Sequence, residues 1–316
     1  MIDGRLWLWC VHILLVTAFC VPSLKVLAMQ KNLEPDRLLV KAVLAGDLEA
    51  TNEALRLGAS PNATYEYRWL DIDVPNVKAI PVLGLALGWK PVFAQSGCMD
   101  SLVRLARYGV DANIPVIRTL LNAGADITRQ TNFDPVTFAI WHCNAHVVRI
   151  LLDHYRAESP LPPTNLIDAA QALRPETVKE LINRVVDMNA CDREGITALI
   201  AVAMQAPRVG SDLTKSVDVA QILINHGANP DIHDKHGMTA LMWAVALRNK
   251  PLVTLLVQKG ATINLRDNGT QVVISLGNAV FVRGSDEGGR TALDWARNAP
   301  EITRLLKNFC KTPPGS

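Results

Sequence analysis

The motif HCNAH, which contains His142, Cys143 and His146, is the first place where the sequence could carry chemistry. Histidines at positions i and i+4 of one helix can bind zinc. The surrounding pattern, however, places His142 at the end of one helix and His146 in the next, so that a turn separates the two imidazoles. We therefore expect no metal site here. Cys143 lies in no motif of a catalytic nucleophile and is expected to be a buried, neutral thiol.

A second histidine group comprises His226, His233 and His236. His226 precedes a glycine that ends a helix, where the helix dipole favours partial positive charge, and the other two fall in a loop. We expect solvent-facing histidines rather than metal ligands. Asn62 and Asn268 each begin an N-glycosylation sequon, which would matter only in a eukaryotic secretory pathway. Phosphate-binding motifs of the types GxxxxGK[ST] and GxGxxG do not occur, so the sequence predicts no catalytic residue, no metal and no cofactor.

The composition narrows the class of protein. Hydrophobic residues make up 49% of the 316 residues and charged residues 20%, which excludes a disordered chain. The formal net charge of +2, from 32 basic and 30 acidic residues, gives no support for binding to nucleic acid. Six cysteines in a chain of this length form no disulfide framework. Whether Cys98, Cys143, Cys191 and Cys310 pair with one another stays open.

Residues 6–21 form an apolar run without charges that predicts an export signal. A proline follows the run, and small or aliphatic residues then occupy the −3 and −1 positions of a cleavage site. We predict that residues 1–28 are a signal peptide, cleaved after Ala28 or alternatively after Ala18. The run is shorter than the about 20 residues that a membrane span needs, so an uncleaved anchor is the second interpretation. Residues 29–36 are then an N-terminal lead-in.

A repeated pattern runs through the rest of the chain. The segments EGITALIAV, HGMTALMWA and GGRTALDWA, which begin at Glu194, His236 and Gly288, align without gaps. A second apolar element follows, and in two successive copies it ends in Gly227 and Gly260, which are 33 residues apart. Each copy is typical of a helix capped by threonine, followed by a second helix that a glycine ends.

This pattern resembles the ankyrin repeat, whose signature is T-P-L-H-x-A with a period of 33 residues. The resemblance implies an all-α fold, an ankyrin-repeat solenoid of about seven helix-turn-helix repeats that must stack to bury their apolar faces. The repeats are predicted near residues 37–63, 100–130, 134–160, 164–193, 197–234, 239–268 and 291–310, within an array that spans 37–310 and precedes a flexible tail, 311–316.

Particular side chains are expected to shape these repeats. Threonines cap first helices at Thr164, Thr197, Thr239 and Thr291. Small residues allow close helix contact at Ala139, Ala169, Ala244 and Ala296. Tyr155 and Val185 stand where other copies have the terminal glycine, so these two copies should be strained or should turn differently.

Three insertions interrupt the predicted array, at 64–99, 205–216 and 268–289. The first is apolar and rich in proline and glycine, whereas the polar character of 205–216 predicts a mobile segment. The copy that lies between residues 80 and 127 can be aligned from residue 100 or from Ile80-Pro81-Val82, and the sequence does not choose between them.

The third insertion contains two β-prone runs around Gly277-Asn278, which predict a β-hairpin near 270–284. This hairpin either projects from the array or folds back over the last repeat, and both alternatives stay open.

Without predicted chemistry, function is expected to reside in the surface. The resemblance implies that a protein partner docks on the concave face, which finger loops and first helices form. Exposed aromatic, methionine and isoleucine side chains there are typical of an interface, although some could instead pack against the 64–99 insertion. The predicted contact residues are Gln130, Thr131, Phe133, Trp141, His142, Arg193, Glu194, Ile196, Met204, Gln205, Lys235, His236, Met238, Leu247 and Arg290.

The sequence thus predicts a non-catalytic protein-binding module, monomeric and exported to the periplasm or secreted. A sharper version is an inhibitor or immunity protein of an exported toxin or hydrolase. One alternative is a scaffold that residues 6–21 anchor in the inner membrane, the only case in which we expect membrane contact. Another is an enzyme with its chemistry in an insertion, where Asp71, Asp73, Asp286 and Glu287 are the main acids. The identity of the partner stays open.

Overall fold

The structure is a computed structural model. It describes residues 35–65, 80–88, 112–127, 134–155, 161–162, 164–184, 187–205, 213–270, 272–276, 279–283 and 289–311. The predicted signal peptide 1–28, most of the 64–99 insertion and the tail from residue 312 lie outside the described residues, as do the four acids considered for catalysis.

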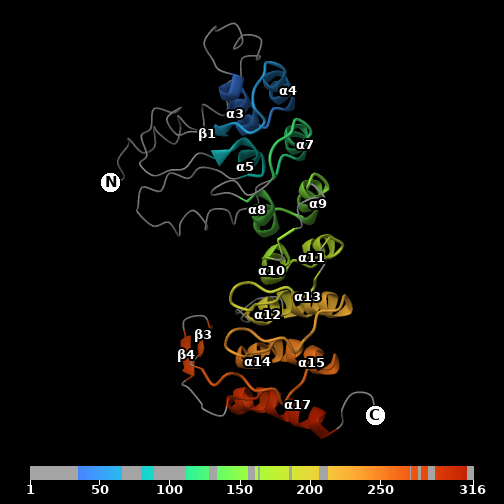
Figure 1. Ribbon diagram of the computed structural model, residues 1–316, viewed down its shortest axis with the longest axis vertical. Coiled ribbons are helices and arrows are strands. Elements are labelled where there is room, and N and C mark those ends of the chain that lie inside the picture. Colours follow the sequence, from blue (N-terminus) through green and yellow to red (C-terminus); the bar gives the residue numbers. More distant parts are fainter. Residues whose placement is uncertain are drawn as a thin grey trace, which may run out of the picture. The chain divides into compact units, whose positions relative to one another are not determined.

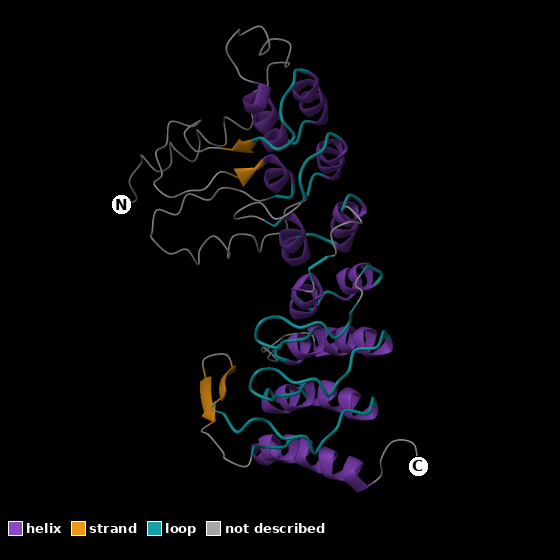
Figure 2. Ribbon diagram, in the orientation of Figure 1, coloured by secondary structure: helices purple, strands orange, loops and turns teal. Residues whose placement is uncertain are grey.

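The chain forms two compact units built from paired helices (Figures 1 and 2). The first comprises residues 1–143 and 150–155, and the second comprises residues 144–149 and 156–316. The first unit contains α3 (Pro35–Ala45), α4 (Leu48–Arg56), β1 (Thr64–Tyr65), β2 (Ile80–Pro81), α5 (Val82–Ala86), α7 (Ile114–Asn122) and α8 (Pro135–His142). Helix α9 (Ala145–Asp153) contributes residues to both units.

Two helix pairs stack in the first unit. Helix α3 packs on α4 and α5, while α7 packs on α4 and α5. Strand β1 pairs antiparallel with β2, with Thr64 opposite Pro81, and β2 leads directly into α5. Because α5 is the first helix of the second pair, the structure favours the alignment from Ile80-Pro81-Val82 over the predicted start at residue 100. Residues 100–111 themselves lie outside the described residues.

The second unit stacks its helices in two rows. It contains α10 (Thr164–Gln171), α11 (Pro175–Ile182), α12 (Ala198–Ala203), α13 (Leu213–Asn225), α14 (Ala240–Ala246), α15 (Lys250–Gln258), β3 (Val272–Leu276), β4 (Ala279–Arg283), α16 (Ala292–Trp295), the 3-10 helix η2 (Ala296–Asn298) and α17 (Pro300–Lys311). One row is α10, α12, α14 and α16, and the other is α11, α13, α15 and α17. Along the chain the described helices make seven successive pairs, in agreement with the predicted number of repeats.

The expected capping and packing residues take their predicted places. Thr197, Thr239 and Thr291 each accept the backbone N–H of the residue three positions later. The backbone N–H and the hydroxyl of Thr291 both donate to Asp294 Oδ2 in a capping box, and these two hydrogen bonds lower the pKa of the Asp294 carboxyl. Thr164 differs, because it is the first residue of α10. The alanines predicted at close helix contacts are all fully buried: Ala139, Ala169, Ala244 and Ala296.

Several predicted boundaries are wrong. Helix α13 begins at Leu213, so the end of the 205–216 insertion is helical. Ser216 is buried there and accepts a hydrogen bond from Asn249 Nδ2 at 3.1 Å, which fixes the added turn. Helix α17 includes Lys311, which the sequence pattern placed in the tail.

Tyr155 does not adopt the left-handed conformation, so its copy turns differently, whereas Val185 lies outside the described residues.

Asn165 is a buried polar residue that costs stability. It is 1% exposed, and neither of its side-chain polar atoms finds a hydrogen-bond partner among the described residues. Ala198 and Ala240 occupy the equivalent place in later repeats and are equally buried. Because an unsatisfied buried amide costs about 1–3 kcal/mol, we expect Asn165→Ala to raise the free energy of unfolding by about 1 kcal/mol in urea titrations.

Asn249 provides the matched control. It is also fully buried, but its side chain accepts from Leu252 N and donates to Ser216 Oγ. Asn249→Ala should therefore lower the free energy of unfolding by about 1–3 kcal/mol. Equal losses in the two variants would show that the Asn165 amide is satisfied in solution.

Candidate partner-binding surface on the finger loops

Three loops in the described part of the second unit share one local structure, and we call them fingers. They comprise residues 192–196, residues 234–238, and residues 267–269 together with 289–290. Each begins with an aspartate, at Asp192, Asp234 and Asp267. The backbone N–H of this aspartate donates to the carbonyl of the last finger residue at 3.0–3.1 Å. Its Oδ1 accepts the N–H groups of the third and the last residue at 2.8–3.0 Å, so each finger is closed by its own aspartate.

The third finger carries the β-hairpin. Gly289 has a φ of +64°, close to the values of +76° at Gly237 and +77° at Gly195, so these three glycines are equivalent. Gly269 and Gly289 therefore correspond to the consecutive third and fourth positions of the other fingers, and residues 270–288 are inserted between them. The insertion is shorter than the predicted 268–289, because the finger closes across it.

The predicted hairpin is present in the backbone. Strand β3 pairs antiparallel with β4, from Val272 opposite Arg283 to Leu276 opposite Ala279. In Figure 1 the strands rise from the finger toward the level of α12 and α14, away from α17, as expected for a hairpin that projects.

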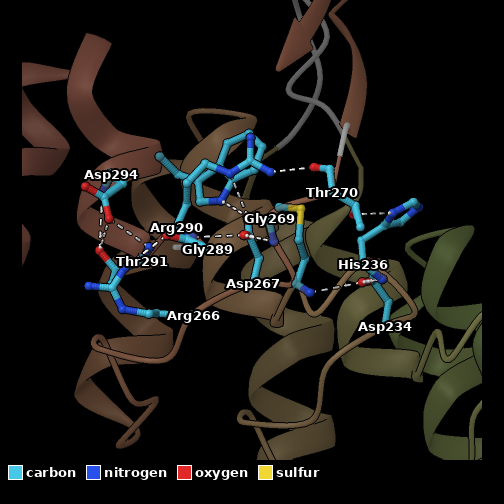
Figure 3. Close-up of polar contacts among 12 residues, drawn as sticks. Asp234, His236, Arg266, Asp267, Gly269, Thr270, Gly289, Arg290, Thr291 and Asp294 are labelled. Atoms are coloured by element: carbon cyan, nitrogen blue, oxygen red, sulfur yellow. Dashed lines mark hydrogen bonds and ion pairs between the residues drawn. The ribbon is translucent and has the colours of Figure 1, made fainter. Parts of the chain in front are cut away.

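A buried ion pair lies at the root of this hairpin (Figure 3). Arg290 Nε is 2.9 Å from Asp267 Oδ2, and the two side chains are 4% and 0% exposed. Trp295 Nε1 donates to the same Oδ2 at 3.0 Å, and the guanidinium lies 4.5 Å from the centre of the Trp295 ring. Arg290 Nη2 also donates to the carbonyl of Thr270 at 2.6 Å. The arginine thus joins the two ends of the inserted segment.

Comparison with the second finger shows whether a finger needs an arginine at the position of Arg290. Trp243 Nε1 donates to Asp234 Oδ2 at 2.8 Å, as Trp295 does to Asp267. Met238 stands in the place of Arg290, and the finger closes without an arginine. The guanidinium is therefore dispensable for a finger and is present where the hairpin is attached.

Neighbouring fingers are hydrogen-bonded to one another. Lys235 N donates to Glu194 O at 2.9 Å, and in the next pair Asn268 N donates to His236 O at 2.9 Å. Lys235 Nζ forms an ion pair with the Glu194 carboxylate, and His236 Nδ1 contacts Thr270 Oγ1 at 3.2 Å. We call these joined fingers the finger row. Its backbone is fixed by repeated bonds, so its surface is preformed.

Only part of the predicted contact set lies at the surface of the structure. In the second unit the exposed or half-buried members are Arg193, Glu194, Ile196, Met204, Gln205, Lys235 and His236. Met238, Leu247 and Arg290 are 0%, 3% and 3% exposed, so their assignment to a contact surface is wrong. Burial of the apolar Met238 and Leu247 side chains is favourable, and Arg290 is held by Asp267.

The remaining predicted contacts belong elsewhere. Trp141 and His142 are half-buried at the end of α8 in the first unit, where the His142 and Phe138 ring centres are 4.6 Å apart. Gln130, Thr131 and Phe133 lie outside the described residues. Their contribution to partner binding stays a prediction.

Three exposed residues in or directly beside the third finger were missed from sequence: Arg266, Asn268 and Thr270. Asn268 and Thr270 were missed because residues from 268 onward were assigned to the insertion, and Arg266 was missed because Asp267 was not recognised as the start of a finger. The distance of 33 residues from Asp234 to Asp267 is the signal that could have placed them in a finger.

The histidines and the cysteine that were considered as metal ligands or as a nucleophile lie in ordinary structural positions. Helix α8 ends at His142 and α9 begins at Ala145, which confirms the predicted break in HCNAH. His226 Nδ1 donates to Ile222 O at 2.7 Å. Among the described residues no group of three or more potential ligands is placed to hold a metal ion. Cys143 is buried, as predicted, and its Sγ donates to Leu87 O at 3.6 Å.

The asparagines of both sequons bridge neighbouring repeats. Asn62 Oδ1 accepts from Asp126 N at 2.6 Å, and its Nδ2 donates to Gly124 O at 3.4 Å. Asn268 Nδ2 donates to Lys235 O at 3.0 Å. A glycan on either Nδ2 would replace one of the two hydrogens of this amide and leave a single donor.

Comparison with known proteins identifies the repeats. The family model for ankyrin repeats (3 copies) matches residues 166–267. The ankyrin repeat protein YahD of Escherichia coli (strain K12) is 25% identical over 192 residues, which are 53% of this chain and 94% of YahD. Human ankyrin repeat and SOCS box protein 6 is 25% identical over 222 residues, which are 68% of this chain and 44% of that protein. The ankyrin repeat domain of Bcl-3 matches the fold with a TM-score of 0.55 and 22% identity, over 85% of this chain and 97% of the domain.

The fold, the closed fingers and these matches define one class. The chain contains ankyrin repeats, which the family model matches at residues 166–267. Its repeats make it a protein–protein interaction module.

Proposed function

We propose that the protein is a non-catalytic module whose finger row binds a protein partner. The observation that carries this proposal is the set of backbone hydrogen bonds between neighbouring fingers, because they hold exposed side chains in fixed positions. Arg193, Glu194 and Lys235 on this row, together with Arg266 directly before the third finger, present both signs of charge. With a net charge of only +2, the chain would select its partner by shape and local pairing rather than by long-range attraction.

We further propose that the protein acts after export, in the periplasm or outside the cell, as an inhibitor or immunity protein of an exported toxin or hydrolase. The apolar run 6–21 supports export, and it lies outside the described residues. Among the helices that the structure describes, none is long and apolar enough to cross a membrane. Cell fractionation with N-terminal sequencing tests the location: a start at residue 19 or 29 supports export, and an intact N-terminus in the membrane fraction supports the anchored scaffold.

Site-specific cross-linking tests the binding surface. A photo-crosslinking amino acid at position 235 lies on the finger row, and one at position 259 lies at the exposed end of α15. We expect position 235 of the full chain to capture one discrete protein in its native compartment and position 259 to capture none. The same products from both positions would contradict a role for the finger row.

A charge swap then measures the contribution of the row. Glu194→Lys combined with Lys235→Glu keeps the ion pair and the net charge but reverses the pattern that a partner meets. We expect at least a tenfold loss of affinity for the captured protein, about 1.4 kcal/mol, with unchanged unfolding. The matched control swaps Lys250 and Glu301, an exposed pair between α15 and α17, and should leave binding unchanged. Equal effects of the two swaps would refute the proposal.

A further inference from the structure

The β-hairpin has two open edges. Within the described residues β3 and β4 pair only with each other, so the outer side of each strand carries backbone N–H and C=O groups without a strand partner. Proteins commonly protect such edges with lysine, proline or inward-pointing charges. Strand β3 contains no proline and no charged residue, and the only charged residue of β4 is Arg283 at its end. The hairpin is thus an unprotected template for another strand.

The protein holds this template in place although its fold does not need it. Joining Gly269 directly to Gly289 would restore a finger with the length and glycine position of residues 234–238. Arg290 nevertheless bonds both Asp267 and Thr270 at the root, and Arg266 Nη1 donates to Gly289 O at 3.0 Å. These bonds restrict the direction in which the strands leave the finger, and a fixed direction lowers the entropy that docking costs.

We infer that a second copy of this chain docks on the hairpin, edge to edge. A two-fold axis places a strand antiparallel to its own copy, so β3 against β3 or β4 against β4 closes a dimer with one four-stranded sheet. An isolated two-stranded hairpin is marginally stable in water, and pairing with two further strands stabilises it. Strand β3, which carries no charge, offers an edge of matching length on every copy, and the net charge of +2 opposes association only weakly. This inference replaces the monomer that we expected from the sequence.

Sedimentation velocity of the full chain tests the dimer. The test variant deletes residues 270–288 and leaves Asp267-Asn268-Gly269-Gly289-Arg290 as a finger of ordinary length. We expect the parent to sediment as a dimer and the deletion variant as a monomer, with the same helical circular dichroism and cooperative unfolding. Because both proteins retain residues 6–21, association through that run would persist in the variant. A monomeric parent, or a dimer that survives the deletion, would overturn the inference.

A point variant tests the root without removing the strands. In Arg290→Met, Asp267 keeps the partners that Asp234 has, namely two backbone N–H groups and a tryptophan Nε1. We expect the dimer dissociation constant to rise about tenfold, because the hairpin direction is less restricted. Amide hydrogen exchange in residues 272–283 of the parent should slow with protein concentration, while exchange in α14 should not. Exchange that is independent of concentration in both segments would refute strand pairing.

Discussion

Asp267→Asn is expected to lower the free energy of unfolding by about 3–5 kcal/mol, the usual cost of removing one member of a buried ion pair. The Asp267 carboxylate accepts from Gly269 N, Arg290 N, Arg290 Nε and Trp295 Nε1. An asparagine side chain retains one acceptor oxygen but turns a donor toward other donors and leaves the buried guanidinium without a counter-charge. Chemical denaturation followed by circular dichroism measures the loss.

Asp192→Asn is the control for this experiment. Asp192 is half-buried, and its Oδ1 accepts only from Glu194 N and Ile196 N among the bonds that close its finger. We expect a loss of about 1 kcal/mol. Adding Arg290→Met to the Asp267→Asn variant should recover part of its stability, because the unpaired charge is then removed. Equal losses at positions 192 and 267, or no recovery, would show that the ion pair does not stabilise the third finger.

Gly237→Ala is expected to produce the second large effect, a loss of about 2–5 kcal/mol in the free energy of unfolding. A Cβ atom at this position would lie 2.6 Å from the backbone nitrogen of Asn268, which cannot move away without breaking its bond to His236 O. The residue also has a φ of +76°, which costs a side chain about 1–2 kcal/mol. Crowding adds about 1–3 kcal/mol. Thermal and urea unfolding of the variant measure the sum.

Two other glycines separate the contributions of crowding and conformation. Gly260 has a φ of +89°, but no atom lies within 4 Å of the place that a Cβ would occupy, so Gly260→Ala tests conformation alone. Gly195 is intermediate, with the Cα of Asp234 at 3.1 Å. We expect the losses to decrease in the order Gly237, Gly195, Gly260. A Gly260 variant as unstable as the Gly237 variant would mean that contact between fingers contributes nothing.

Local features of the fold were predictable from the sequence because they repeat at short range. Thr197 and Thr239 cap the helices that begin just after them, and Ala244 is small because a neighbouring helix packs there. Each depends on a few adjacent residues and on the period of 33. The sequence pattern therefore identified the fold and the number of repeats.

The candidate surface was less predictable because it depends on contacts between distant residues. Arg290 was expected to be exposed from the pattern, but its partner Asp267 lies 23 positions earlier, beyond the inserted strands. Met238 lies in a finger, where a period alone cannot tell an inward from an outward side chain. The first helix of the second repeat was ambiguous because a long segment separates α5 from α7.

The third finger, which closes beneath the hairpin, affects how the sequence of such a protein can change during evolution. Because Asp267 and Arg290 complete their finger whatever lies between Gly269 and Gly289, the helices on either side do not depend on the length or composition of the intervening segment. Lengthening a surface loop costs little free energy. At this junction, one inserted recognition segment can therefore be exchanged for another during evolution, while the stacked repeats stay unchanged.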